Sequence, residues 1–172
     1  MRDRVDHLTP GMTLPSVALS ATDGSKVDLA ALAGRSLLIV YPWTGRPGLP
    51  NPPGWDDLPG AHGSTPELEG FRDHADAFAS SGVRLFGLSR QTTDYQLELV
   101  ARLGLSFPIL SDAEGRFTTA LQLPCFTAGG EIYLKRLTLF IEDGRIAAVF
   151  YPVAAPAHHA AEVWRWLGSQ IP

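Results

Sequence analysis

Ser64 lies in the sequence Gly63-Ser64-Thr65-Pro66-Glu67, which begins a predicted helix directly after a long loop. The first turn of a helix offers N–H groups without intrahelical partners and the positive end of the helix dipole. An anion or a thiolate placed there is therefore stabilised. In a redox protein, this is the position where a reactive cysteine is expected.

Ser64 has structural interpretations as well. Ser64 and Glu67 have the spacing of a capping box, and Thr65-Pro66 offers an alternative cap with proline at the first helical position. A hydrolase nucleophile requires the pattern Gly-x-Ser-x-Gly, and the glycines near Ser64 lack that spacing. Local sequence alone favours a helix cap, and a serine hydrolase is not expected.

Few other residues could support chemistry. Cys125 is the only cysteine, which excludes an internal disulfide framework and a zinc site built from several thiolates. Its neighbours Pro124 and Phe126 favour a small buried hydrophobic residue. His158 and His159 are adjacent, so on a helix they point about 100° apart. We expect both histidines to be solvated at a helix start and not to bind a metal together.

The elements that must position Ser64 are a strand and a long loop before it. A continuous apolar run predicts a buried strand over 36–41, and the segment 42–63 is rich in proline and glycine. A loop of this length inside a compact domain is usually functional. Trp43 and Trp55, in or beside it, either line the site entrance or only pack the loop. Apolar residues spaced by three and four predict a helix over 65–80.

Periodicity and turn signals predict further elements on both sides of this region. They are an entry hairpin (17–19 and 26–29), a single helical turn (28–34), a strand (83–89), a helix (92–103), a short strand (107–110), a short helix (116–121), an antiparallel hairpin (133–141 and 145–151) and a closing helix (157–171). Such alternation predicts an α/β fold of three layers, with one sheet covered by helices on both faces.

Composition sets further bounds. The 172 residues are expected to form one domain, 1–172, and the hydrophobic share of 45% and charged share of 19% are ordinary for a soluble protein. No segment approaches the roughly 20 apolar residues that span a bilayer, and the charged N-terminus lacks the pattern of a secretory signal. We therefore expect no membrane partner and a cytoplasmic location. The net charge of −4 and the scattered basic residues argue against nucleic acid.

Several motifs in the chain resemble those of one family. Tyr41-Pro42 ends a predicted strand, Gly63-Ser64-Thr65-Pro66-Glu67 begins a helix, and Phe71-Arg72-Asp73 follows in it. Further matches are Gly11-Met12-Thr13-Leu14-Pro15, Asp23-Gly24, Phe86-Gly87-Leu88-Ser89, Phe107-Pro108-Ile109-Leu110-Ser111-Asp112, and Lys135-Arg136-Leu137-Thr138-Leu139-Phe140-Ile141 before Asp143-Gly144. In this order the motifs resemble the peroxiredoxins, most closely the PrxQ type, also called bacterioferritin comigratory protein. The resemblance implies a thioredoxin-like fold with a central mixed sheet.

Carried over residue by residue, the resemblance assigns roles to three positions. The peroxidatic cysteine of the family falls on Ser64, its strand-end proline on Pro42 and its active-site arginine on Arg136. In the proteins that this chain resembles, the thiolate attacks the peroxide, and another thiol reduces the resulting sulfenic acid. A helix N-terminus and a guanidinium are suited to lowering a thiol pKa from about 8.5.

Serine cannot replace that cysteine, because its hydroxyl stays protonated near neutral pH and oxygen lacks the reactivity of sulfur with peroxides. The chain as written is therefore predicted to be inactive as a peroxidase. Either Ser64 is an engineered replacement that preserves a reduced-like site, or it is a natural loss of function. In the second case the chain is a thioredoxin-fold binding or regulatory protein without turnover.

The chain also departs from the family around Ser64. Ala61 replaces the usual threonine three residues before it, and Thr44 could supply the hydroxyl if the inserted loop, 44–62, folds outward. Glu69 stands where many PrxQ proteins have a resolving cysteine. The resemblance therefore implies a one-cysteine enzyme reduced by an external thiol, such as a thioredoxin- or glutaredoxin-like protein, or one in which Cys125 resolves. The expected substrate is hydrogen peroxide or an organic hydroperoxide, with no cofactor or metal, and the expected state is a monomer or homodimer.

Overall fold

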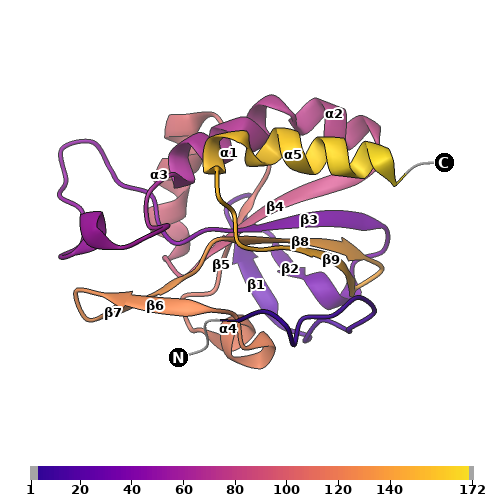
Figure 1. The fold of residues 1–172 in the computed structure, drawn as a ribbon, viewed down its shortest axis with the longest axis horizontal. Coiled ribbons are helices and arrows are strands. Elements are labelled where there is room, and N and C mark those ends of the chain that lie inside the picture. Colours follow the sequence, from indigo (N-terminus) through magenta and orange to yellow (C-terminus); the bar gives the residue numbers. More distant parts are fainter. Residues whose placement is uncertain (1–3, 171–172) are drawn as a thin grey trace.

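A seven-stranded mixed sheet forms the centre of the computed structural model, which describes residues 4–170 (Figure 1). The strand order is β2-β1-β5-β4-β3-β8-β9. The strands are β1 (Ala18–Ala21), β2 (Lys26–Asp28), β3 (Arg35–Val40), β4 (Val83–Ser89), β5 (Ile109–Ser111), β8 (Leu137–Glu142) and β9 (Arg145–Phe150). β3 pairs parallel with β4 and antiparallel with β8, so the Tyr41 end of β3 lies in the middle of the sheet.

Helices cover both faces of this sheet (Figure 1). They are α1 (Ser64–Asp73), α2 (Ala75–Ser80), α3 (Thr93–Leu103), α4 (Arg116–Leu121) and α5 (Pro156–Ser169), with short 3₁₀ turns η1 (Leu29–Ala31) and η2 (Trp55–Asp57). Leu37 and Ile39 of β3 pack against α1, α2, α3 and α5, whereas Leu38 and Val40 point to the opposite face, where α4 lies. This alternation follows from the two-residue period of a strand. The predicted three-layer α/β fold is confirmed.

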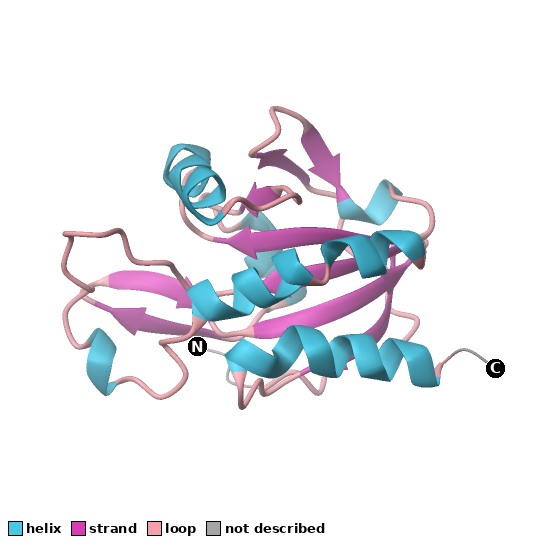
Figure 2. Cartoon of the chain, turned by 90° about the horizontal axis from the view of Figure 1, so that it is seen from above, coloured by secondary structure: helices cyan, strands magenta, loops and turns pink. Residues whose placement is uncertain are grey.

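A second, two-stranded sheet lies beside the inserted loop. It consists of β6 (Cys125–Ala128) and β7 (Glu131–Leu134), paired antiparallel. In Figure 2 this hairpin and η2 of the loop lie next to each other at one end of the molecule, and Trp55, Ala128 and Tyr133 share one apolar cluster. Segments 44–62 and 125–134 therefore pack against each other at this end of the molecule.

Two of the predicted elements differ from the structure, and one strand was not predicted. The strand predicted over 133–141 is divided, because the chain leaves β7 after Leu134 and enters β8 at Leu137, and β6 is the strand that was not predicted. The helix predicted over 65–80 is interrupted at His74. Both the backbone N–H and the ring Nδ1 of His74 lie within hydrogen-bond distance of the carbonyl oxygen of Gly70, so the ring competes at the point where the helix breaks.

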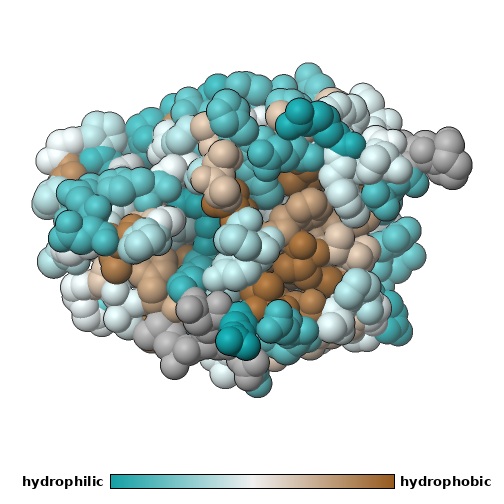
Figure 3. Space-filling view, in the orientation of Figure 1, coloured by the Kyte–Doolittle hydropathy of each residue, from teal (hydrophilic) through white to brown (hydrophobic). Residues whose placement is uncertain are grey.

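One edge of the sheet is β9, and it is partly covered. Gly11 N–H donates to the Ile146 carbonyl and Ile146 N–H donates to the Met12 carbonyl, so the N-terminal segment pairs with the start of this strand. The rest of β9 carries partly exposed apolar side chains, from Ala147 to Phe150. Figure 3 shows an apolar area below α5, on a surface that is otherwise mostly hydrophilic. Within the described part of the chain, no helix has both the length and the apolarity that crossing a bilayer requires.

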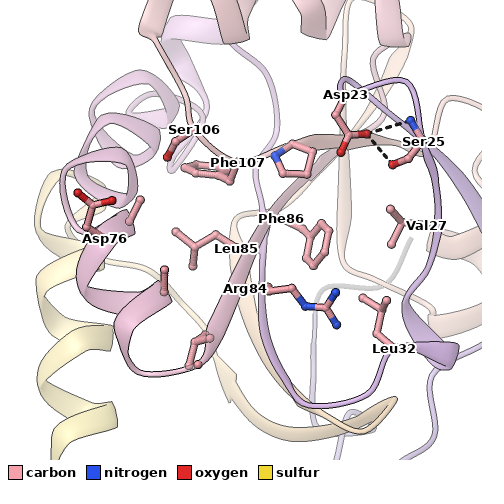
Figure 4. Close-up of a pocket in the computed structure, with 15 residues that line it drawn as sticks. Asp23, Ser25, Val27, Leu32, Asp76, Arg84, Leu85, Phe86, Ser106 and Phe107 are labelled. Carbon is pink, nitrogen blue, oxygen red and sulfur yellow. Dashed lines mark hydrogen bonds between the residues drawn. The ribbon is translucent and has the colours of Figure 1, made fainter.

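A gap in the sheet lies at the end opposite to the Tyr41 end of β3. The pairing of β4 with β5 begins only at Gly87 and Ile109, because Pro108 lacks the N–H that would extend the ladder. The resulting cavity of about 790 Å³ has Leu85 and Phe107 on one side of β4 and Phe86 on the other (Figure 4). It is distant from the residues that the sequence marks for chemistry.

Candidate functional site

Ser64 begins α1 and is buried, with an exposed fraction of 3%. The residue that caps the helix is Gly63, in the left-handed conformation with φ of 112°, and no side chain caps the helix. A Cβ atom at position 63 would lie 2.9 Å from Pro156 Cγ of α5, so glycine fits both the turn and the close packing. The capping box predicted from Ser64 and Glu67 is therefore not formed. The Ser64 hydroxyl is directed to another partner.

That partner is Arg136, which lies between β7 and β8 and is 5% exposed. Its Nη1 atom donates to Ser64 Oγ over 3.1 Å and to Glu67 Oε1 over 2.9 Å. Its Nη2 atom is 3.1 to 3.4 Å from the carbonyl oxygens of residues 60, 61 and 62. One guanidinium thus connects the end of the inserted loop with the first turn of α1.

Glu67 is fully buried beneath this contact, and only one of its carboxylate oxygens has a hydrogen-bond partner. Burial raises the pKa of Glu67 from 4.5 to about 7, although the positive charge of Arg136 lowers it in part. The cause is desolvation, which disfavours the charged form of a carboxyl group. Glu67 therefore holds its proton to a higher pH than an exposed carboxyl group would, which weakens its neutralisation of the Arg136 charge.

A cavity of about 110 Å³ opens beside Ser64. Thr44, which is 2% exposed, and the first turn of α1 line it together with residues of the inserted loop. The lining residues are Trp43, Thr44, Gly45, Asn51, Trp55, Ala61, His62, Gly63, Ser64, Thr65 and Pro66. Trp43 and Trp55 thus line the cavity, which agrees with the interpretation that they lie at the site entrance. Hydroxyl groups of Ser64 and Thr44 and N–H groups of a helix start can bind a small polar molecule or an anion.

The remaining predicted site residues are placed differently. Pro42 is buried just before the cavity wall, and its carbonyl accepts a hydrogen bond from Gln91 Nε2. Cys125 is half-buried at the start of β6, packs against the core on the α4 side of the sheet, and donates from Sγ to the Leu123 carbonyl. Burial raises the pKa of the Cys125 thiol. The structure thus joins Ser64, Arg136 and Thr44 and leaves Cys125 outside the cavity wall.

Sequence analysis missed the buried polar groups behind the site. The expectation that both His158 and His159 are solvated is wrong for His159, which is 3% exposed. His159 Nε2 and Thr138 Oγ1 share a hydrogen bond of 2.8 Å, and burial, followed by the Arg136 charge, lowers the pKa of His159 to about 4. The imidazole is therefore neutral near pH 7. Among residues 4–170, no three histidine, cysteine or acidic side chains form a group suited to a metal ion.

Comparison with known protein families decides the class of this site. The family model described as redoxin matches residues 9–163, which is most of the chain. The chain belongs to the redoxin family. A relative within this family is a candidate peroxiredoxin of Mycobacterium tuberculosis, which is 30% identical over 165 residues, covering 91% of this chain and 94% of the relative. The predicted peroxiredoxin resemblance is thereby confirmed.

Solved structures of redoxin-family proteins share the thioredoxin-like fold. A cysteine-to-serine mutant of Xylella fastidiosa PrxQ has a TM-score of 0.78 at 22% identity, covering 97% of this chain and 99% of that one. Peroxidoxin BcpB of Mycobacterium tuberculosis has a TM-score of 0.76 at 23% identity, covering 96% and 100%. The bacterioferritin comigratory protein of Xanthomonas campestris, described for its alkyl peroxide reduction activity, has a TM-score of 0.73 at 22% identity, covering 94% and 98%.

Proposed function

We propose that the cavity beside Ser64 is the peroxide site of a thiol-dependent peroxidase in which serine occupies the position of the attacking cysteine. The observation that carries this proposal is the contact of Arg136 Nη1 with Ser64 Oγ, 3.1 Å long and buried at the start of α1. A guanidinium at that distance from a cysteine sulfur would favour the thiolate and could donate to the peroxide oxygen. Thr44, on the cavity wall, supplies a second polar group.

The reaction of the cysteine form follows from these groups. The thiolate sulfur attacks one peroxide oxygen, a bond from sulfur to oxygen forms, and the O–O bond breaks. Sulfur is oxidised to the sulfenic acid, and the other oxygen takes a proton and leaves as water or an alcohol. Two reducing thiols then return the cysteine and release water while forming a disulfide. A thioredoxin- or glutaredoxin-like protein is the proposed physiological source of those thiols.

In the chain as written, this cycle stops before its first step. The Ser64 hydroxyl accepts the Arg136 hydrogen bond but does not ionise near neutral pH. The site then holds a peroxide without reducing it, which is also what a binding or regulatory protein of this fold would do. Both versions of the proposal require the same cavity and differ only in whether the native residue is cysteine or serine.

Peroxide consumption with a dithiol reductant tests the proposal. The Ser64 protein should consume hydrogen peroxide at the rate of the buffer and reductant alone, and the Ser64→Cys variant should consume it catalytically. A Cys125→Ser variant is the matched control for the one thiol that this sequence contains. Turnover by the Ser64 protein would contradict the role assigned to serine, and an inactive, folded Ser64→Cys variant would contradict the peroxidase site.

The same variant tests the role of Cys125. One equivalent of peroxide is added to the Ser64→Cys protein, which is then analysed by mass spectrometry without reductant. A disulfide between the introduced thiol and Cys125 would support a resolving role. A sulfenic acid or its further oxidation products without that disulfide would identify a one-cysteine enzyme, which the placement of Cys125 against the opposite core cluster favours.

A further inference from the structure

The inserted loop, 44–62, gives the Ser64 cavity its small size. Pockets that hold drug-sized ligands have volumes of about 300 to 1,000 Å³, whereas this cavity measures about 110 Å³. A water molecule takes a share of about 30 Å³ in the liquid. The cavity therefore suits a molecule of a few non-hydrogen atoms, such as hydrogen peroxide, and is smaller than the pockets that hold drug-sized ligands.

Trp43 separates this cavity from a second one. The neighbouring cavity measures about 260 Å³ and is lined by Trp43, Arg90, Gln91, Thr92, Tyr95, Glu131, Ile132 and Tyr133. Trp43 is the one residue that lines both cavities. Its ring lies edge-on to Trp55, with centroids 5.2 Å apart and planes at 66°. The indole of Trp43 thus forms a wall between a small polar space and a larger space with aromatic sides.

Contacts on both sides hold this wall in place. Tyr95 donates from its hydroxyl to the Thr44 carbonyl over 2.8 Å, and Arg102 Nη2 donates to the Gly45 carbonyl over 2.9 Å, so the chain just after Trp43 is tied to α3. Trp55, which lines the Ser64 cavity, is 2% exposed and lies edge-on to Tyr133 of the second cavity, with centroids 4.9 Å apart. A substituent on the ligand therefore cannot enter the second cavity without displacing packed aromatic rings.

The rim of the cavity is polar. Asp56 accepts a hydrogen bond from Asn51 Nδ2 over 3.0 Å and lies 2.8 Å from His62 Nε2, so two lining residues are connected through one carboxylate. The side chain of His62 is 57% exposed. An apolar group that extended out of the cavity would meet these polar side chains and water, which gives it no favourable burial.

We propose that Trp43 is a specificity-determining residue that restricts the Ser64 site to hydrogen peroxide and excludes hydroperoxides with bulky organic groups. This inference rests on the proposed function of the site. It assigns to Trp43, directly before the inserted loop, the role of setting the substrate size by separating the Ser64 cavity from the neighbouring aromatic cavity. Replacing Trp43 by alanine would join the two cavities and admit an aromatic hydroperoxide.

Ligand binding to the Ser64 protein tests the proposal without turnover. Since this chain has no cysteine at position 64, a peroxide in the cavity is not consumed there during a titration. Hydrogen peroxide should shift the amide NMR signals of Gly63 and Thr65, and cumene hydroperoxide at equal concentration should not. In the Trp43→Ala variant, cumene hydroperoxide should shift them as well. Equal shifts by both peroxides in the unmodified chain would overturn the proposal.

Kinetics of the cysteine form provide the second test. In the Ser64→Cys variant, kcat/KM for hydrogen peroxide should exceed that for cumene hydroperoxide by at least about tenfold, and adding Trp43→Ala should lower this ratio by at least about fivefold. Leu49→Ala is the matched control, because Leu49 belongs to the inserted loop that follows Trp43, is 58% exposed and lines neither cavity. An unchanged ratio with Trp43→Ala would refute the role of Trp43.

The two proposals fail in different ways. A Ser64→Cys protein that is folded but reduces neither peroxide contradicts the proposed peroxidase site, and the NMR titration then still decides whether the cavity selects by size. A Ser64→Cys protein that reduces both peroxides equally well supports the peroxidase site and contradicts the selectivity.

Discussion

Replacing Glu67 by glutamine should remove a loss of stability that the protein undergoes as the pH rises. Glu67 is fully buried, and its carboxyl group has a pKa raised by desolvation to about 7, against 4.5 for the unperturbed group. Below about pH 4.5 the group is protonated in both the folded and the unfolded chain. Between these two values the folded chain binds a proton that the unfolded chain has lost, so the free energy of unfolding decreases with pH until it levels above the folded-state pKa.

The size of the effect follows from the pKa difference. One pKa unit corresponds to about 1.4 kcal/mol, so the protein should lose about 2 to 3 kcal/mol of stability between about pH 5 and pH 8 through this one group. The Arg136 contact at 2.9 Å does not prevent the loss, because the desolvation of a buried ion pair can exceed its attraction. Glutamine keeps an acceptor for Arg136 and does not titrate.

Urea unfolding, followed by tryptophan fluorescence at several pH values, measures this difference. The stability of the Glu67→Gln variant relative to the unmodified chain should rise by about 2 to 3 kcal/mol across that pH range. Glu69→Gln is the matched control in the same helix, since the Glu69 side chain is 40% exposed, and its difference should stay within about 0.5 kcal/mol. If the free energies of unfolding of the Glu67→Gln variant and the unmodified chain change with pH in the same way, the pKa of Glu67 is not raised in the folded chain.

Two further substitutions test the packing around the site. Thr138→Val removes the hydrogen-bond partner of the buried His159 ring and should lower the free energy of urea unfolding by about 1 to 3 kcal/mol; an unchanged midpoint and slope would contradict that role. Gly144→Ala places a Cβ against the Ala30 carbonyl at a φ of +75°, whereas Gly24→Ala, at a φ of +86°, meets open space. Both should suffer from the left-handed backbone, by about 1 kcal/mol or more, and thermal unfolding should show the larger loss for Gly144→Ala; equal losses would show that the close approach has no cost.

Much of the fold could be predicted because its signals are local. The apolar runs of β3 and β4 identify strands buried on both faces, and the β4 prediction agrees with the structure at both ends. Helix α3 begins after Thr92, whose side chain accepts from the Tyr95 N–H, and ends at Gly104 in the left-handed conformation. Such start and stop residues act through their nearest neighbours, so the sequence alone can show them.

The site could be predicted only in part. Family motifs identified Ser64, Arg136 and Pro42. The local pattern around Ser64, however, favoured a helix cap, and both His158 and His159 were expected to be solvated. In the structure Gly63 caps the helix, and His159 lies in the core. The β6–β7 hairpin was not predicted, because its strands are short and gain much of their burial from Trp55 of the inserted loop.

The sequence by itself determined where the main strands and helices lie, that Ser64 stands near the start of a helix, and that this position carries no thiol. These properties depend on side-chain type and on spacing of a few residues. Only the tertiary structure decided that Arg136 reaches Ser64 from 72 residues away and that Trp43 lines the cavity beside Ser64. It also decided that Glu67 is buried. Contacts, volume and desolvation arise when distant segments pack together, and that packing raises the pKa of Glu67 and gives the site its size.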